Sequence, residues 1–216
     1  MIEPRSIDHI TLCVENLEEA EFLFTKILGF EVIWSARDVG TDKSSMDTVV
    51  VQCGAARIAL MQGRDKAMKS QITDFIERYG QGVQHVALEV DDIEAVCREW
   101  EAHGVKFSGA VKEGRDGFGP LKQRFTYPLF PGSGLFIELT QREHGEERAK
   151  TFVRSTVESL YKDIERDPKL PRNLVSNRHS ASGQSQHYHI AAPSVFFQLL
   201  SEAPACFLSI SKSARH

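Results

Sequence analysis

Residues 7–14 read Ile-Asp-His-Ile-Thr-Leu-Cys-Val, and residues 83–90 read Val-Gln-His-Val-Ala-Leu-Glu-Val. In both stretches apolar residues alternate with others, which is typical of a strand with one buried face. Each stretch carries a histidine at its third position, His9 in the first and His85 in the second. This repeat predicts that the chain is built from two copies of one module.

A helix is expected after each of these strands. In the first copy Asn16 is a suitable N-cap, acidic residues follow it, and Gly29 is placed to end the helix. In the second copy the acidic pair Asp91 and Asp92 precedes the helix, and Gly104 is placed to end it. The same start and stop signals therefore recur at corresponding places.

Three further strands complete each predicted module. The chain is thus predicted to be an α+β protein of paired β-α-β-β-β modules, residues 5–62 and 83–142, whose half-open sheets enclose a shared cavity. The expected strands cover residues 31–36, 48–52 and 57–61 in the first module and residues 105–107, 123–127 and 134–139 in the second.

The segments outside the modules differ in character. Residues 70–80 read as a short amphipathic helix that starts at a serine and stops at a glycine. A paired-module domain of residues 1–142 would be followed by a C-terminal helix in residues 143–170. Residues 171–216 are expected to form a mobile polar tail with an apolar end at residues 195–200. That apolar end needs a groove or a partner subunit to cover it, so a homodimer is one expected assembly.

Composition restricts the classes of partner. The chain has 216 residues, 41% of them hydrophobic, and a net charge of −4. Such a chain has no basic field to hold nucleic acid or an anionic membrane, and no apolar run approaches the ~20 residues that span a bilayer. No signal-peptide pattern begins the sequence, and the four cysteines form no C-x-x-C pair. A cytoplasmic, reduced protein is therefore expected.

Two histidines and one carboxylate point to a metal site. His9 and His85 occupy equivalent places in paired modules, so a pseudo-twofold relation would bring them together. Glu138 lies within the apolar run 135–139, where a lone buried carboxylate is costly unless it is paired or binds a cation. Two imidazoles and a carboxylate are the facial triad of mononuclear iron sites, which leaves positions open for oxygen and substrate. The alternative is that the histidines pack in the core and Glu138 faces solvent, but the repeated position and the embedded carboxylate favour the metal site.

Four short segments carry a resemblance to a known family. They are Ser-Gln-Ile at 70–72, Gly-Val-Gln-His-Val-Ala-Leu at 82–88, Gln-Arg-Phe-Thr at 123–126 and Phe-Ile-Glu-Leu-Thr-Gln-Arg at 136–142. The paired modules resemble the vicinal-oxygen-chelate superfamily, which has a glyoxalase-like fold. More narrowly, about residues 5–168 are similar to the C-terminal, iron-bearing domain of the 4-hydroxyphenylpyruvate dioxygenase family.

The resemblance implies a set of site residues and a reaction. It implies iron(II), Fe(2+), held by His9, His85 and Glu138. It also implies a substrate pocket with Phe125 in its wall and three glutamine amides that hydrogen-bond the substrate: Gln71, Gln84 and Gln123. Composition alone would favour ordinary surface glutamines and is equally compatible with a core phenylalanine. The implied activity is that of a non-haem iron(II)-dependent dioxygenase, which uses O2 to decarboxylate a 2-oxo acid oxidatively and to hydroxylate the remainder.

Two departures from the family concern the pocket wall. The family has an asparagine where this chain has Gln62, and the start of the family's closing helix is replaced by residues 149–154. The small-molecule substrate is therefore expected to be related to 4-hydroxyphenylpyruvate without necessarily being that compound.

Two other function classes remain open. One is a different paired-module enzyme, such as a ring-cleaving dioxygenase or a metal-dependent lyase or isomerase. The other is a metal-free small-molecule-binding resistance protein, against which the carboxylate in an apolar strand argues. A glyoxalase-type lyase is expected to use a fourth protein ligand, near residues 60–62, where the sequence has no carboxylate.

Overall fold

The computed structural model describes residues 3–117, 119–130, 132–143 and 152–167. The predicted paired modules are present. The first consists of β1 (Ser6–Cys13), α1 (Leu17–Phe22) with a π-helical turn η1 (Leu23–Ile27), β2 (Glu31–Gly40), β3 (Ser44–Cys53) and β4 (Ala56–Asp65). The second consists of β5 (Gly82–Glu89), α3 (Ile93–Ala102), β6 (Phe107–Arg115), β7 (Pro120–Thr126) and β8 (Phe136–Arg142). Helix α2 (Gln71–Tyr79) links the modules, and α4 (Arg154–Arg166) follows the second.

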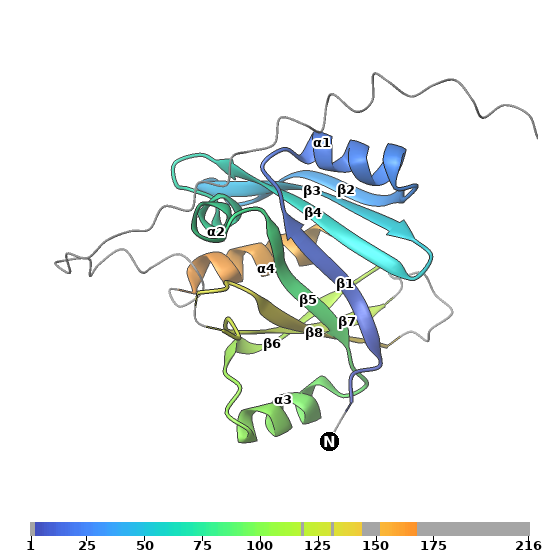
Figure 1. Ribbon diagram of the computed structural model, residues 1–216. Coiled ribbons are helices and arrows are strands. Elements are labelled where there is room, and N and C mark those ends of the chain that lie inside the picture. Colours follow the sequence, from blue (N-terminus) through green and yellow to red (C-terminus); the bar gives the residue numbers. More distant parts are fainter. Residues whose placement is uncertain (1–2, 118, 131, 144–151, 168–216) are drawn as a thin grey trace, which may run out of the picture. The chain divides into compact units, whose positions relative to one another are not determined.

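The strands of the described residues form one curled mixed sheet in the order β2-β3-β4-β1-β5-β8-β7-β6 (Figure 1). The two first strands, β1 and β5, are antiparallel neighbours at its centre. Each pairs on its other side with the last strand of its own module in parallel, β1 with β4 and β5 with β8. The order is therefore symmetric about the β1–β5 pair, which confirms the predicted fold.

Each module's helix covers one face of its own half of the sheet, α1 over β3 and β4 and α3 over β6 and β8. Figure 1 shows these helices at opposite ends, with α4 between the two halves. Two apolar cores form beneath α1 and α3, and both lie away from the space between the modules. Their buried residues are Leu17, Val49, Val51 and Leu60 in the first module, and Val90, Ile93, Val96, Cys97, Phe107 and Leu139 in the second.

The residues that were predicted to start and end the two module helices do so in the structure. The Asn16 side chain accepts hydrogen bonds from the first-turn amides of α1, and the Asp92 side chain accepts one from Ala95 N at 3.0 Å. Gly29 and Gly104 follow the helices with φ of 76° and 89°, a region that glycine enters without steric cost.

Strand β6 was placed wrongly by the sequence pattern. It was expected at residues 105–107 but runs from Phe107 to Arg115. Because β6 is an edge strand, most of its residues are exposed on both faces, including Lys112 and Glu113, so no apolar alternation marks it. Strand β2, at the other edge, likewise continues past its predicted end through a bulge that contains Asp38.

The difference from the family at Gln62 had suggested a residue of the pocket wall, but Gln62 does not form part of that wall. Its Oε1 atom accepts a hydrogen bond from Leu17 N, the first residue of α1, at 2.9 Å. In the second module Gln141 Oε1 accepts from Ile93 N, the first residue of α3, also at 2.9 Å. The two glutamines thus tie the last strand of each module to its helix at equivalent positions.

Gln62→Ala and Gln141→Ala are each expected to lower the free energy of unfolding by about 1 kcal/mol, because each leaves a helix N-terminal amide without its acceptor. Urea unfolding measures both. Gln81→Ala serves as the control, since the bond from Glu15 N to Gln81 is exposed and should matter by about 0.5 kcal/mol or less. A loss no larger than that of the control at both positions would contradict the proposed role.

Helix α4 is bonded to both modules. The guanidinium of Arg154 donates to the backbone carbonyls of Arg37 and Asp38 in the β2 bulge, both at 2.8 Å. On the other side Lys112 of β6 forms an ion pair with Asp163 at 2.9 Å. The helix predicted within residues 143–170 therefore begins at Arg154. The predicted tail of residues 171–216, with its apolar end, lies outside the described residues.

Candidate metal centre

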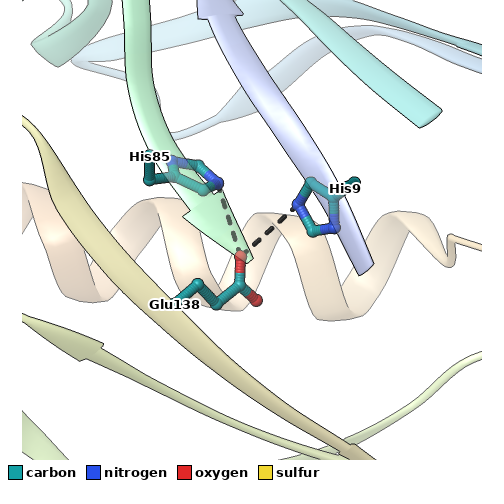
Figure 2. A group of neighbouring side chains, drawn as sticks. All are labelled: His9, His85 and Glu138. Carbon is teal, nitrogen blue, oxygen red and sulfur yellow. Dashed lines mark ion pairs between the residues drawn. The ribbon is translucent and has the colours of Figure 1, made fainter. Parts of the chain in front are cut away.

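The structure brings together the three residues that the sequence singled out as metal ligands. His9 lies on β1, His85 on β5 and Glu138 on β8, and all three are buried. Glu138 Oε2 lies 3.4 Å from His9 Nε2 and 3.3 Å from His85 Nε2 (Figure 2). One ligand atom from each residue falls within 4.8 Å of the other two.

Strand register explains this convergence. In the central pair His9 faces Ala87, and in the neighbouring parallel pair Ala87 faces Glu138. His9 and Glu138 therefore flank Ala87 from the strands on either side. His85 lies two residues before Ala87 on the same strand, hence on the same face. No loop is needed to assemble the site, because three adjacent strands hold it.

Each imidazole has its Nδ1 atom against the side chain of the preceding residue. His9 Nδ1 lies 2.9 Å from Asp8 Oδ1, and His85 Nδ1 lies 3.1 Å from Gln84 Oε1. A ring in its Nδ1–H tautomer would donate a hydrogen bond to the oxygen that faces it. Nε2 of each ring is then turned toward Glu138.

A hydrogen bond from a neighbouring side chain also orients the carboxylate of Glu138. Gln123 Nε2 donates to Glu138 Oε1 at 2.5 Å, which leaves Oε2 facing the two imidazoles. Burial would raise the pKa of Glu138, but its polar neighbours, the two imidazoles and Gln123, lower it below its usual range overall. Burial lowers the pKa of His85, and Glu138 only partly offsets this. A charged carboxylate beside a neutral imidazole is the protonation state that a metal requires.

These residues fit a divalent cation. Ligand atoms about 2.1 Å from one ion and at right angles to each other are about 3 Å apart, close to the two distances at Glu138 Oε2. With Nδ1 protonated on both rings, three lone-pair-bearing atoms converge in a buried space. A cation at their centre would relieve this repulsion, and one carboxylate with two neutral imidazoles suits iron(II) among other divalent metals.

Asp8 belongs to this site but was not predicted. Its carboxylate is held by Arg142, with Arg142 Nε 2.9 Å from Oδ2, and Arg142 Nη1 pairs in turn with Asp116 Oδ2 at 2.5 Å. Arg57 Nη1 donates to the backbone carbonyl of Asp8 at 2.9 Å. All these charged side chains are buried. An acidic residue inside an alternating apolar strand was the available signal, the same signal that identified Glu138.

Acidification is expected to weaken the fold through Asp8. Burial would raise the pKa of this carboxyl, but the hydrogen bond from His9 and the charge of Arg142 hold it well below its usual range. The unfolded chain, with an ordinary pKa of about 3.9, therefore binds more protons than the folded chain at low pH. The stability that Asp8 confers is fully present above about pH 4 and is lost as the pH falls through the folded pKa.

Urea unfolding of the metal-free protein between pH 7 and pH 3 measures this effect. Asp8→Asn should show a shallower decline in the free energy of unfolding than the wild type, because it lacks the titrating group. An identical pH dependence in the two proteins would contradict the assignment.

A cavity of about 80 Å³ adjoins the three residues. One water takes about 10–15 Å³ of such space, so the cavity has room for several waters or a small ligand. All four residues predicted to bind substrate line it: Gln71, Gln84, Gln123 and Phe125. The remainder of the wall is mostly apolar and includes Trp34, Met46, Met61, Phe152, Val157 and Leu160.

Three observations refine the predicted pocket. Gln71 is buried, and its Oε1 atom has no hydrogen-bond partner among the described residues, so it is available to a ligand. Trp34 and Phe152, which the sequence did not single out, lie together with ring centroids 5.8 Å apart, and Phe152 packs edge-on against His9. The first-module equivalent of Glu138 is Ala59, because Thr11 faces Ala59 as Ala87 faces Glu138.

Comparison with known proteins agrees with the fold. Residues 8–121 match the family model of the Glyoxalase/Bleomycin resistance protein/Dioxygenase superfamily. This match covers more than half of the chain, and the chain belongs to that superfamily. It is homologous to proteins named 4-hydroxyphenylpyruvate dioxygenase and 4-hydroxymandelate synthase.

The 4-hydroxyphenylpyruvate dioxygenase of Yarrowia lipolytica is 30% identical over 213 residues, covering 80% of this chain and 52% of the relative. The 4-hydroxyphenylpyruvate dioxygenase of Aspergillus fumigatus is 28% identical, and the match covers 78% of this chain and 50% of that relative. The structure of a variant of 4-hydroxymandelate synthase from Streptomyces coelicolor has a TM-score of 0.67 at 26% identity. The match covers 74% of this chain and 53% of that chain. The methylmalonyl-CoA epimerase of Mycobacterium tuberculosis, at 24% identity and a TM-score of 0.51, shares the fold.

This chain spans about half the length of the curated relatives that it matches. Among the described residues, none of the helices combines the length and apolar character needed to cross a membrane.

Proposed function

We propose that this chain is a non-haem iron(II)-dependent dioxygenase that acts on a 2-oxo acid by oxidative decarboxylation and hydroxylation. The observation that carries the proposal is the buried cluster of His9, His85 and Glu138 at the wall of a mostly apolar cavity. The homologues named 4-hydroxyphenylpyruvate dioxygenase support a dioxygenase reaction.

The number of protein ligands distinguishes this function from a glyoxalase-type lyase. The position equivalent to Glu138 in the first module is Ala59, which has no donor atom. Ala59 lines the cavity, so the place of a fourth ligand is left to substrate or oxygen. This is the arrangement of facial-triad sites, which keep open positions. The sequence analysis expected this position near residues 60–62, whereas the strand register places the equivalent of Glu138 one residue earlier, at Ala59.

The chain's own residues would hold and shield the substrate. The amides of Gln71, Gln84 and Gln123 line the cavity, where they can donate to carboxylate or carbonyl oxygens. Apolar side chains from α4 close one side and keep water from the reacting groups. Bound iron(II), held by the three ligands, would supply the redox chemistry that activates O2.

A cytoplasmic location is part of the proposal. Cys13, Cys53 and Cys97 are free thiols, two of them buried, as is usual in a reducing compartment.

Anaerobic titration of the iron(II)-loaded protein tests the function. Phenylpyruvate-type and aliphatic 2-oxo acids are added separately, and a metal-to-ligand charge-transfer band in the visible is expected with at least one of them. Oxygen uptake that depends on the same acid should follow. No band with any 2-oxo acid, together with oxygen uptake on a catechol, would move the assignment to the ring-cleaving class. Failure to bind any divalent metal would favour a metal-free binding protein.

A further inference from the structure

The central strand pair contains two β-bulges at matching places. Between β1 and β5, Ile7 faces Leu88 and His9 faces Ala87, so Asp8 is an extra residue on β1. The second irregularity mirrors the first: Thr11 faces His85 and Leu12 faces Val83, which makes Gln84 an extra residue on β5. In each strand the extra residue immediately precedes the candidate ligand histidine.

The bulges change where these side chains point. Regular alternation would put Asp8 and His9 on opposite faces, and likewise Gln84 and His85. A bulge re-aims a side chain, and here both members of each pair are buried, with 1% and 4% of Asp8 and His9 exposed. Gln84 and His85 are 3% and 7% exposed. Each extra residue can therefore reach the Nδ1 atom of the ring beside it, at 2.9 Å and 3.1 Å.

We propose that Asp8 and Gln84 are positioning residues that hold His9 and His85 in the Nδ1–H tautomer, with Nε2 aimed at the metal position. The inference rests on the proposed function for its consequence, but the tautomers themselves are properties of the metal-free protein. A ligating histidine needs its second nitrogen fixed in this way, because the partner sets both tautomer and ring direction.

The two modules use different chemistry for the same purpose. Asp8 is a carboxylate clamped by Arg142, whose Nε and Nη2 atoms lie 2.9 Å and 3.3 Å from its two oxygens. Gln84 is a neutral amide. In addition, Thr11 Oγ1 lies 2.8 Å from His85 Nε2 and can donate to its lone pair when no metal is present. His9 is therefore the more firmly oriented ligand, and His85 is the one whose lone pair has an internal competitor.

Nitrogen-15 NMR of histidine-labelled, metal-free protein reads the tautomers directly. In the wild type, both His9 and His85 should show the Nδ1–H form. Gln84→Leu removes the acceptor at similar volume and should mix the tautomers of His85 alone, whereas Gln84→Glu retains an acceptor and should preserve the Nδ1–H form. Asp8→Asn should mix the tautomers of His9 alone, because Arg142 can hold the single amide oxygen and leave the amide nitrogen facing the ring.

Titration with Co(II) alone provides the second measurement. Asp8→Asn and Gln84→Leu should each weaken Co(II) binding by about tenfold or more, the usual effect of losing an outer-shell partner. Asp92→Asn is the matched control, because asparagine also caps a helix well and α3 lies outside the cavity. Should Asp8→Asn fail to fold, Gln84→Leu still tests the positioning role in the second module.

The outcomes separate the two proposals. Folded variants whose histidine tautomers and Co(II) affinity equal those of the wild type would overturn the positioning roles. Tautomers that respond as expected, in a wild type that binds neither Co(II) nor iron(II), would support the positioning roles while rejecting the proposed function.

Discussion

His85→Ala is expected to abolish metal-dependent turnover while the fold survives. The substitution removes one of three candidate ligands from β5, and the remaining His9 and Glu138 offer too few donors to hold iron(II) firmly. The fold should persist because the apolar cores beneath α1 and α3 do not include His85. Anaerobic iron(II) titration, oxygen uptake and circular dichroism measure the three consequences. Turnover should fall below detection.

His103→Ala is the matched control for this experiment. His103 caps the C-terminus of α3 on the surface, so its loss should leave iron(II) binding and turnover unchanged. Loss of fold in His85→Ala would indicate a structural metal instead. Turnover at the wild-type rate after removal of His85 would reject the site.

Arg142→Met is expected to lower the free energy of unfolding by about 3–5 kcal/mol, the range for breaking a buried ion pair from one side. Arg142 lies between the carboxylates of Asp8 and Asp116, and all three side chains are almost completely buried. Methionine fills similar space but removes the guanidinium that the two buried carboxylates share. Urea unfolding at neutral pH provides the measurement.

Arg37→Met offers the comparison for Arg142→Met. The Arg37 side chain is about half exposed, and its ion pair with Asp47 spans 3.4 Å, so its loss should cost about 1 kcal/mol or less. Similar losses in the two variants would show that the Asp8–Arg142–Asp116 arrangement does not stabilise the fold beyond a surface ion pair.

Much of the architecture could be predicted from local pattern. The repeated strand with its histidine, the acidic helix starts and the terminal glycines recur in both modules, and each reports a short-range preference of the chain. The edge strand β6 could not be placed, because a strand exposed on both faces lacks the alternation that identifies strands.

The sequence by itself determined the two-module fold and the candidate ligands. Alternation, capping and a carboxylate in an apolar strand are local signals, and the repeat adds a symmetry that pairs His9 with His85. Only the tertiary structure decided what surrounds them. The register shifts that turn Asp8 and Gln84 onto the imidazoles, and the contact of Arg142 with Asp8, depend on how distant strands align. Pairing of that kind is set by the packing of the whole sheet, which no local pattern encodes.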